Sequence, residues 1–258
     1  NPVTVVKNGD VEFENVMFSY KKGSDTYSLK NVNLKINSGD TIGIIGGTGS
    51  GKTSLVHMIP RFYDVSSGEI LVDGVNVKKY SFHQLRDRIG VVPQKAVLFN
   101  GTIADNLRWG KEDATKEEML RAVEIAQGSD VIAAKKNGLE EVVLQGGKNF
   151  SGGQRQRLTI ARALVREPEI LILDDSASAL DFATDAKLRK AIKEETKGMT
   201  VFIVSQRAAS VRYADEILVL DDGELVGKGS HDELLDNCPV YQEIYYSQFP
   251  KEVTRHGE

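Results

Sequence analysis

Apolar residues follow two rhythms along this chain, one typical of strands and one typical of helices. Partly alternating apolar positions over residues 11–20 and 29–36 predict strands with one face in a sheet. Short apolar runs at residues 41–45, 170–173 and 201–204 are instead flanked by helical patterns, as buried parallel strands are. The pattern predicts an α/β fold with a largely parallel sheet, preceded by a mainly β region.

Turn and capping signals divide the chain further. Asp73-Gly74 and Asp222-Gly223 each follow an apolar run and predict tight hairpins. From Gln94 to about residue 147 the pattern is helical, and Thr115 with Glu118 forms a capping-box pattern before an apolar stripe. This stretch is interpreted as a helical insertion rather than a second domain with its own core.

Length and composition narrow the class of protein. The 258 residues suffice for one large α/β domain, and the formal charge of −4 does not favour a nucleic-acid partner. A single cysteine, Cys238, excludes an internal disulfide and fits a reducing compartment. No apolar run reaches the length that crosses a bilayer. Because the first residue is Asn1 rather than methionine, we expect a processed chain or an excised piece, and a membrane part of the parent, if there is one, would lie outside this sequence.

Residues 46–53 read GGTGSGKT and follow the apolar run 41–45. The pattern G-x-x-x-x-G-K-[ST] between a strand and a helix is typical of a phosphate-binding loop (P-loop), whose backbone N–H groups form an anion-binding nest. Lys52 would reach the β- and γ-phosphates, and the Thr53 hydroxyl would take a Mg²⁺ position. The alternative is a glycine-rich turn without a ligand. The predicted nucleotide-binding residues are Gly46, Gly47, Thr48, Gly49, Ser50, Gly51, Lys52, Thr53 and Ser54.

Two acids, Asp174 and Asp175, follow the apolar run 170–173. A carboxylate at the end of a buried strand can hold Mg²⁺ through its water shell, although such a residue alone is more often structural. With a P-loop upstream, Asp174 is the predicted magnesium-site acid.

Ser151, Gly152, Gly153 and Gln154 precede a helical pattern and permit two readings. Ser151 and Gln154 have the spacing of a capping box. A serine hydroxyl, two glycine N–H groups and a helix N-terminus also make a second anion site. Both readings can hold together. Two phosphate sites with one P-loop suggest that the second serves a nucleotide held by another subunit.

Together these motifs resemble the nucleotide-binding domain of ATP-binding-cassette (ABC) transporters over nearly the whole chain. Residues 98–107 (LFNGTIADNL) are similar to the exporter branch of that family. The resemblance implies one α/β domain with a P-loop NTPase (RecA-like) core, an N-terminal antiparallel β subdomain and an inserted α-helical subdomain. The expected boundaries are 1–93 and 160–245 for the core with its β subdomain, 94–159 for the helical subdomain and 246–258 for a polar tail.

The resemblance also assigns roles to single residues. Tyr20 is placed where a ring stacks on adenine, and Gln94 where a glutamine reaches Mg²⁺ and couples to the transmembrane part. Residues 151–154 form the signature motif, with Phe150 where leucine is usual. Ser178 and Asp181 belong to the D-loop. The implied cofactors are ATP and Mg²⁺, the latter held by Thr53, Gln94 and Asp174.

In that family two such domains pack head to tail, and each ATP lies between one P-loop and the other domain's signature. The implied partners are a second ABC nucleotide-binding domain and the transmembrane domains of the transporter, with no nucleic acid. The expected location is the cytoplasmic face of a membrane, with this piece itself soluble. Closure on ATP and opening after hydrolysis would power transport.

Two positions depart from the family pattern. Asp175 stands where glutamate usually positions the attacking water, and Gln206 where histidine is usual. Aspartate is one methylene shorter, and a misplacement of about 1 Å can cost roughly 10²-fold in rate. Gln206 can donate a hydrogen bond but cannot become a cation. We therefore expect weak or no hydrolysis at this chain's own catalytic residues, Gln94, Asp175 and Gln206, in one half of a heterodimeric exporter.

Three alternatives remain open. The first is a homodimeric exporter domain in which Asp175 acts as a slow base. The second is a soluble, non-transport ABC ATPase with a regulatory or nucleic-acid role, although a tandem P-loop or a coiled-coil insertion is not present in the sequence. The third is a guanine-nucleotide switch, although the sequence has no Asn-Lys-x-Asp motif.

Overall fold

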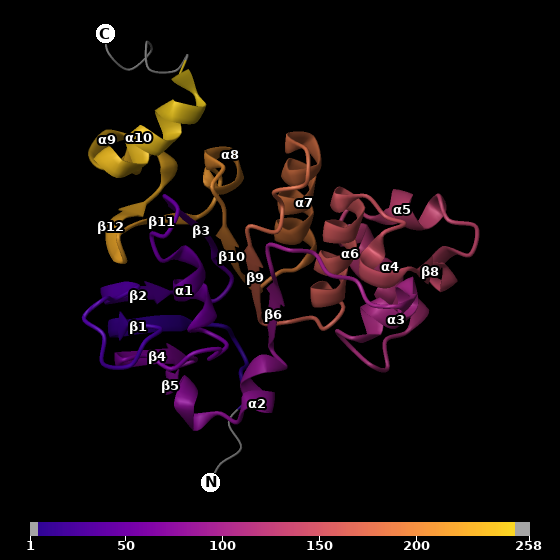
Figure 1. Cartoon of the computed structure of the whole chain (residues 1–258), viewed down its shortest axis with the longest axis horizontal. Helices are drawn as coiled ribbons and strands as arrows, with labels where there is room; N and C mark the ends of the chain where they lie inside the picture. The colour runs from indigo at the N-terminus through magenta and orange to yellow at the C-terminus, as the bar shows by residue number, and fades with distance from the viewer. Residues whose placement is uncertain (1–4, 251–258) are drawn as a thin grey trace. The chain divides into compact units, whose positions relative to one another are not determined.

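The computed structural model describes residues 5–250, and Figure 1 shows their helices and strands. These residues belong to two compact units. Unit 1 comprises Asn1–Arg86 and Thr200–Glu258, and unit 2 comprises Asp87–Met199. Within residues 5–250, no helix combines the length and the apolar character that crossing a bilayer requires.

The N-terminal strands of unit 1 form an antiparallel sheet in the order β2-β1-β4-β5. Its strands are β1 (Val11–Phe18), β2 (Leu29–Ile36), β4 (Ser67–Val72) and β5 (Val75–Asn76). The alternation in β1 is interrupted because the register shifts between Phe13 and Val16, where Asn15 has a φ of 47°. This bulge explains why the sequence pattern alternates only partly.

The second group of strands in unit 1 is centred on β3 (Thr41–Gly46). Strands β10 (Thr200–Val204) and β11 (Glu216–Asp221) pair with β3 in parallel, and β12 (Glu224–Gly229) pairs with β11 antiparallel. All five residues of β10 are buried, which accounts for its continuous apolar sequence. The helices of unit 1 are α1 (Lys52–His57), the 3₁₀ turn η1 (Val77–Lys79), α2 (Phe82–Arg86), α8 (Ala208–Val211), α9 (His231–Asn237) and α10 (Pro239–Gln248).

Unit 2 combines a parallel strand pair with a helical region. The pair consists of β6 (Ile89–Val92) and β9 (Ile170–Asp174), and a short ribbon joins β7 (Gly101–Thr102) to β8 (Val142–Val143). The helices are α3 (Ile103–Arg108), α4 (Lys116–Ile125), α5 (Ser129–Ala133), α6 (Gly152–Leu164) and α7 (Phe182–Glu195), with 3₁₀ turns η2 (Gly138–Glu140) and η3 (Gln145–Gly147). At α4 the predicted capping box is confirmed, since Thr115 Oγ1 accepts from the Glu118 N–H at 3.2 Å.

The α/β class, the N-terminal antiparallel sheet and the helical part are thus confirmed. The boundaries expected for the core and the helical subdomain stay predictions. Helix α10 extends to Gln248, so residues 246–248 of the expected polar tail are helical, and residues 251–258 lie outside the described part of the chain.

A single carboxylate fixes the N-terminal segment of unit 1. Asp73, at the β4–β5 turn with a φ of 52°, accepts hydrogen bonds from the four consecutive N–H groups of residues 7–10 at 2.7–3.0 Å. Thr200 Oγ1 donates to the Gly9 carbonyl at 2.8 Å from the other side of the segment. The segment therefore follows a path that a side chain more than sixty positions away determines.

We predict that Asp73→Ala lowers the free energy of unfolding by about 1–3 kcal/mol more than Asp222→Ala, because four N–H groups lose a charged acceptor. Asp222 is the matched control, since it has a left-handed φ of 46° at the corresponding β11–β12 turn, and its exposed carboxylate pairs with Lys30 at 2.8 Å. Urea unfolding of both variants measures the difference. Equal losses would contradict the role given to Asp73.

Candidate functional site

The glycine-rich loop of unit 1 joins β3 to α1, and two close backbone approaches determine its shape. A Cβ at Gly46 would lie 2.4 Å from the Leu220 carbonyl oxygen, and one at Gly51 would lie 2.6 Å from that of Ser28. Gly51 also has a φ of 104°, which side chains rarely adopt. Both positions therefore require glycine for the fold itself. Between them, residues 47–49 are exposed.

The Lys52 ammonium bends back across this loop. Its Nζ donates to the carbonyl oxygens of Gly46 at 2.8 Å and Gly47 at 2.9 Å, and the residue is buried. A positive charge is thus held beside the exposed backbone, where a phosphate would meet it. The next residue, Thr53, is exposed. The loop has the shape and charge of an anion site.

Tyr20 lies against the same loop region. Its hydroxyl is 2.7 Å from the hydroxyl of Ser54, a buried residue in the first turn of α1. The structure therefore brings the predicted adenine-stacking residue and the predicted phosphate loop together in unit 1.

In unit 2, the predicted magnesium-site acid ends a fully buried strand. Asp174 is the last residue of β9, and it is only 6% exposed. Asp175 follows with a left-handed φ of 52°, which aspartate adopts more readily than most side chains do. Gln94 donates from Nε2 to Asp175 Oδ2 at 3.2 Å. Two of the predicted catalytic residues thus contact each other.

The predicted magnesium ligands suit a nucleotide-bound ion better than a protein cage. In the described part of the chain, no three His, Cys, Asp or Glu side chains cluster as a metal site. Thr53 offers a hydroxyl, Gln94 an amide oxygen and Asp174 a carboxylate. Oxygen donors of this kind, few in number, fit Mg²⁺ that also takes waters and substrate phosphates.

The signature residues form the capping box that their spacing predicted. Ser151 Oγ accepts from the Gln154 N–H at 3.2 Å, and Gln154 Oε1 accepts from the Ser151 N–H at 2.9 Å. A Cβ at Gly152 would come no closer than 3.7 Å to surrounding atoms, and one at Gly153 no closer than 3.4 Å. Unlike Gly46 and Gly51 of the P-loop, these two are not required by packing within the chain. They lie in the first turn of the 13-residue helix α6, where the Gln154 N–H is bonded to Ser151.

The predicted D-loop residues lie between β9 and α7. Asp181 caps α7, because its carboxylate accepts from the Thr184 N–H at 2.7 Å and from the Thr184 hydroxyl at 3.0 Å. These hydrogen bonds, the backbone one first, hold the pKa of Asp181 below its ordinary value of 3.8. Their stabilising effect is present above that value and is lost as the pH falls through the lowered pKa. Ser178 is in the turn, with its N–H 3.4 Å from the Asp175 carbonyl oxygen.

Gln206 follows β10 in unit 1 and is exposed. Its carbonyl accepts from Gln248 Nε2 at 2.7 Å, and Gln248 Oε1 accepts from the Ala208 N–H at 2.8 Å. The end of α10 therefore holds both sides of this loop. Sequence analysis did not identify Gln248, because no local pattern links it to a loop about forty residues earlier.

Gln156 is a second residue that sequence analysis missed. It is 4% exposed on α6, donates from Nε2 to the Gln94 carbonyl at 3.3 Å, and accepts at Oε1 from the Ala179 N–H at 3.0 Å. Gln156 thus connects α6 to the backbone of Gln94 and to the backbone of Ala179 in the predicted D-loop. The sequence signal that could have identified Gln156 is a polar residue at a position where the helical pattern predicts burial.

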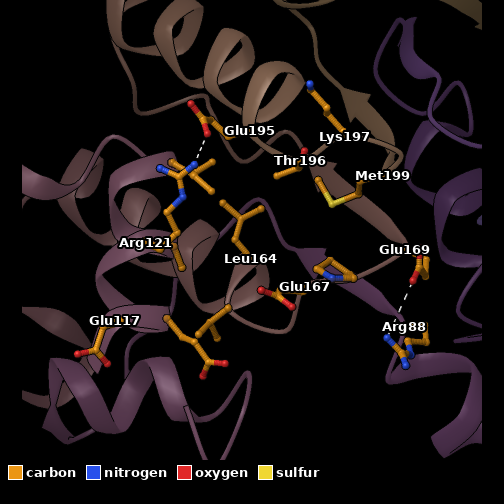
Figure 2. A pocket seen from close by; sticks show the side chains of 15 residues that line it. Arg88, Glu117, Arg121, Leu164, Glu167, Glu169, Glu195, Thr196, Lys197 and Met199 are labelled. Atoms are coloured by element: carbon orange, nitrogen blue, oxygen red, sulfur yellow. Dashed lines mark hydrogen bonds and ion pairs between the residues drawn. The ribbon is translucent and has the colours of Figure 1, made fainter. Parts of the chain in front are cut away.

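A hollow of about 640 Å³ in unit 2 contains none of the predicted site residues (Figure 2). Apolar side chains such as Leu164 and Met199 share its lining with charged ones. Figure 2 shows an ion pair between Arg121 and Glu195 and another between Arg88 and Glu169. The residues predicted to bind nucleotide therefore do not line this hollow.

Comparison with known proteins gives the family. A family model described as ABC transporter matches residues 29–178, which is more than half of the chain, so the chain belongs to the ABC transporter family. Over 245 residues it is 46% identical to the uncharacterized ABC transporter ATP-binding protein YfiB of Bacillus subtilis (strain 168), covering 95% of this chain and 42% of that protein. It is also 41% identical over 242 residues to the ATP-dependent lipid A-core flippase of Escherichia coli (strain K12), covering 93% and 41% respectively.

The fold is similar to that of a solved bacterial Atm1-family ABC exporter with ATP bound. The TM-score is 0.91 at 35% identity, covering 96% of this chain and 43% of that one. The chain is therefore an ATP-binding domain of the ABC family, and it spans less than half the length of these relatives.

We predict opposite stability effects of alanine at two glycines. Gly152→Ala should raise the free energy of unfolding by up to about 1 kcal/mol, because alanine favours the helix and meets no close neighbour. Gly51→Ala should lower it by at least about 1 kcal/mol, because the left-handed backbone and the Ser28 carbonyl both oppose a Cβ. Chemical unfolding checks both signs, and a destabilising Gly152→Ala would show that packing does require that glycine.

Proposed function

We propose that this chain is the ATP-binding domain of an ABC exporter with a degenerate hydrolytic site of its own and an intact signature that serves a partner domain. The observation that supports this most is the contrast between two regions. Residues 151–154 have a complete capping box and two glycines at which a Cβ would meet no close neighbour, whereas Asp175 and Gln206 replace the residues usual for hydrolysis.

Nucleotide binding rests on the P-loop of unit 1. Lys52, which lies beside the exposed loop backbone, would bind the β- and γ-phosphates, and Tyr20 would stack on adenine. Thr53, Gln94 and Asp174 would hold Mg²⁺, which supplies charge neutralisation between the phosphates when bound. The D-loop residues Ser178 and Asp181 are assigned to the contact between the two domains.

Hydrolysis at this site should be weak because neither replacement supplies what the reaction needs. The attacking water must be positioned in line with the γ-phosphate. The Asp175 side chain is one methylene shorter than glutamate. Its Oδ2 already accepts a hydrogen bond from Gln94. Gln206 has an amide that can donate to a phosphate oxygen but cannot carry the positive charge of a protonated histidine.

The signature motif of this chain, residues 151–154, would serve the hydrolytic site of the partner domain. Ser151 and the N–H groups of the first turn of α6 would bind the γ-phosphate of an ATP held by a second, different nucleotide-binding domain. ATP would close the pair, and hydrolysis at the partner's P-loop would open it and move attached transmembrane domains at the cytoplasmic face of a membrane. The names of the exporter and flippase relatives favour transport over a soluble regulatory ATPase.

The homodimeric exporter domain is the second candidate. It shares the same fold and motifs, but its partner is a second copy of this chain and Asp175 supports turnover. A partner chain that carries glutamate and histidine at the two positions would favour the heterodimer, and a partner with the same aspartate and glutamine would contradict it. The transported substrate is not assigned.

We predict that Lys52→Ala abolishes tight binding of Mg-ATP, whereas Ser151→Ala leaves binding by the isolated chain unchanged. The reason is that Lys52 belongs to the chain's own nucleotide site and Ser151 to the partner's. Equilibrium titration of the purified variants with Mg-ATP measures both. ATP affinity unchanged by Lys52→Ala, or lost in Ser151→Ala, would refute the assignment.

Thr115→Ala is the matched control for Ser151→Ala. Thr115 and Ser151 are each the N-cap of a helix of unit 2, and each belongs to a complete capping box. Each substitution should cost about 1 kcal/mol of stability. A binding defect shared by the two variants would therefore report on stability rather than on the signature.

A further inference from the structure

The ring of Tyr20 is held by three contacts from three segments of unit 1. The Phe18 ring lies 4.7 Å away at an interplanar angle of 74°, and the Tyr63 ring lies 5.1 Å away at 86°. The hydroxyl is 2.7 Å from Ser54 Oγ. Neither neighbouring ring lies flat on Tyr20, and the residue is 55% exposed, so a planar base has access to the ring.

Tyr63 is itself fixed by its loop. Arg61, with a left-handed φ of 56°, donates from Nε to Asp64 Oδ1 at 2.6 Å and closes the turn that contains Tyr63. The Tyr63 ring also lies 5.6 Å from Phe18 and stacks at 6.5 Å on His57 of α1. The residue is 45% exposed, so its position does not result from core burial.

We propose that Tyr63 is a positioning residue for adenine recognition, which holds the Tyr20 ring in the orientation that accepts the base. The proposal rests on the proposed function, in which Tyr20 stacks on adenine. An exposed tyrosine loses side-chain freedom when it binds a ligand, and a ring already held in place avoids that loss. Perpendicular aromatic pairs at this separation are attractive, so Tyr63 can supply the restraint.

The third contact ties the ring to the phosphate loop. Ser54 is two residues after Lys52 in α1, so its hydrogen bond to Tyr20 sets the ring relative to the helix that carries the phosphate-binding lysine. Tyr63 and Ser54 together restrain the ring at its side and at its hydroxyl. Removing Tyr63 should therefore weaken recognition of the base and leave recognition of the phosphates intact.

The test compares two probes, Mg-ADP and Mg-pyrophosphate, which share a diphosphate and differ in the nucleoside. Calorimetric titration of the purified chain gives both affinities for the wild type, Tyr63→Ala, Tyr63→Leu, Tyr63→Phe, Tyr20→Ala and the Tyr20→Ala, Tyr63→Ala double variant. Tyr63→Leu keeps apolar bulk without a ring, and Tyr63→Phe keeps the ring. Tyr213→Ala removes another exposed tyrosine of unit 1 and is the matched control.

We expect Tyr63→Ala and Tyr63→Leu to weaken ADP binding by roughly 2- to 10-fold and to leave pyrophosphate binding unchanged. Tyr63→Phe should restore the wild-type ADP affinity, and Tyr213→Ala should not alter it. In the Tyr20→Ala background, Tyr63→Ala should have no further effect, because the residue acts through Tyr20.

Three results would overturn the proposal: equal weakening of both probes, no weakening of ADP binding, or an undiminished effect in the Tyr20→Ala background. The proposed function fails differently. A wild-type chain that binds neither probe would refute the nucleotide site itself, whereas pyrophosphate binding without any effect of Tyr20→Ala on ADP would refute only the stacking role on which Tyr63 depends.

Discussion

The burial of β3 between β10 and β11 is the constraint on which the nucleotide site of unit 1 depends. Ile42, Ile44 and Ile45 are completely buried, and both neighbouring strands pair with β3 in parallel. The strand therefore ends at a fixed position, where the Leu220 carbonyl of β11 leaves room only for a glycine at residue 46. The chain must turn there, and Lys52 closes the turn by bonding to the carbonyls at its start.

The sequence predicted those features that depend on residues close together in the chain. The P-loop, the capping boxes at Thr115 and Ser151 and the two Asp-Gly turns are local, so their spacing alone carries the information. The capping box of α9, formed by Ser230 and Glu233, had the same signal, but helices α9 and α10 were not predicted.

The remaining features arise from contacts between distant segments. Asp73 binds residues 7–10, Gln248 holds the loop after β10, and Gln156 connects α6 to Gln94. In each case the side chain is an ordinary polar residue, and only the fold determines its partner. Tyr63 is similar, because its relation to Tyr20 depends on how the loop at Arg61 turns. Periodicity and motif spacing contain no information about such pairs.

The proposed function depends on an asymmetry within one chain. Gly46 and Gly51 of the P-loop are required by packing, whereas a Cβ at Gly152 or Gly153 would meet no close neighbour, which leaves room for the proposed ligand from a partner domain. In the proposed function, Asp175 is one methylene shorter than the usual glutamate, and Gln206 cannot carry the positive charge of a protonated histidine. A site that binds ATP but rarely hydrolyses it, beside a signature that remains complete, is the expected result.

The most direct measurement is Mg-ATP hydrolysis by the purified chain as a function of protein concentration, beside an Asp175→Glu, Gln206→His double variant, with ATP binding measured in both. The account predicts that the natural chain binds ATP and hydrolyses almost none. The double variant should gain a rate that rises more than proportionally with concentration, because two copies must meet to complete a site. A natural chain that already shows such concentration-dependent turnover would contradict the degenerate site and favour the homodimer.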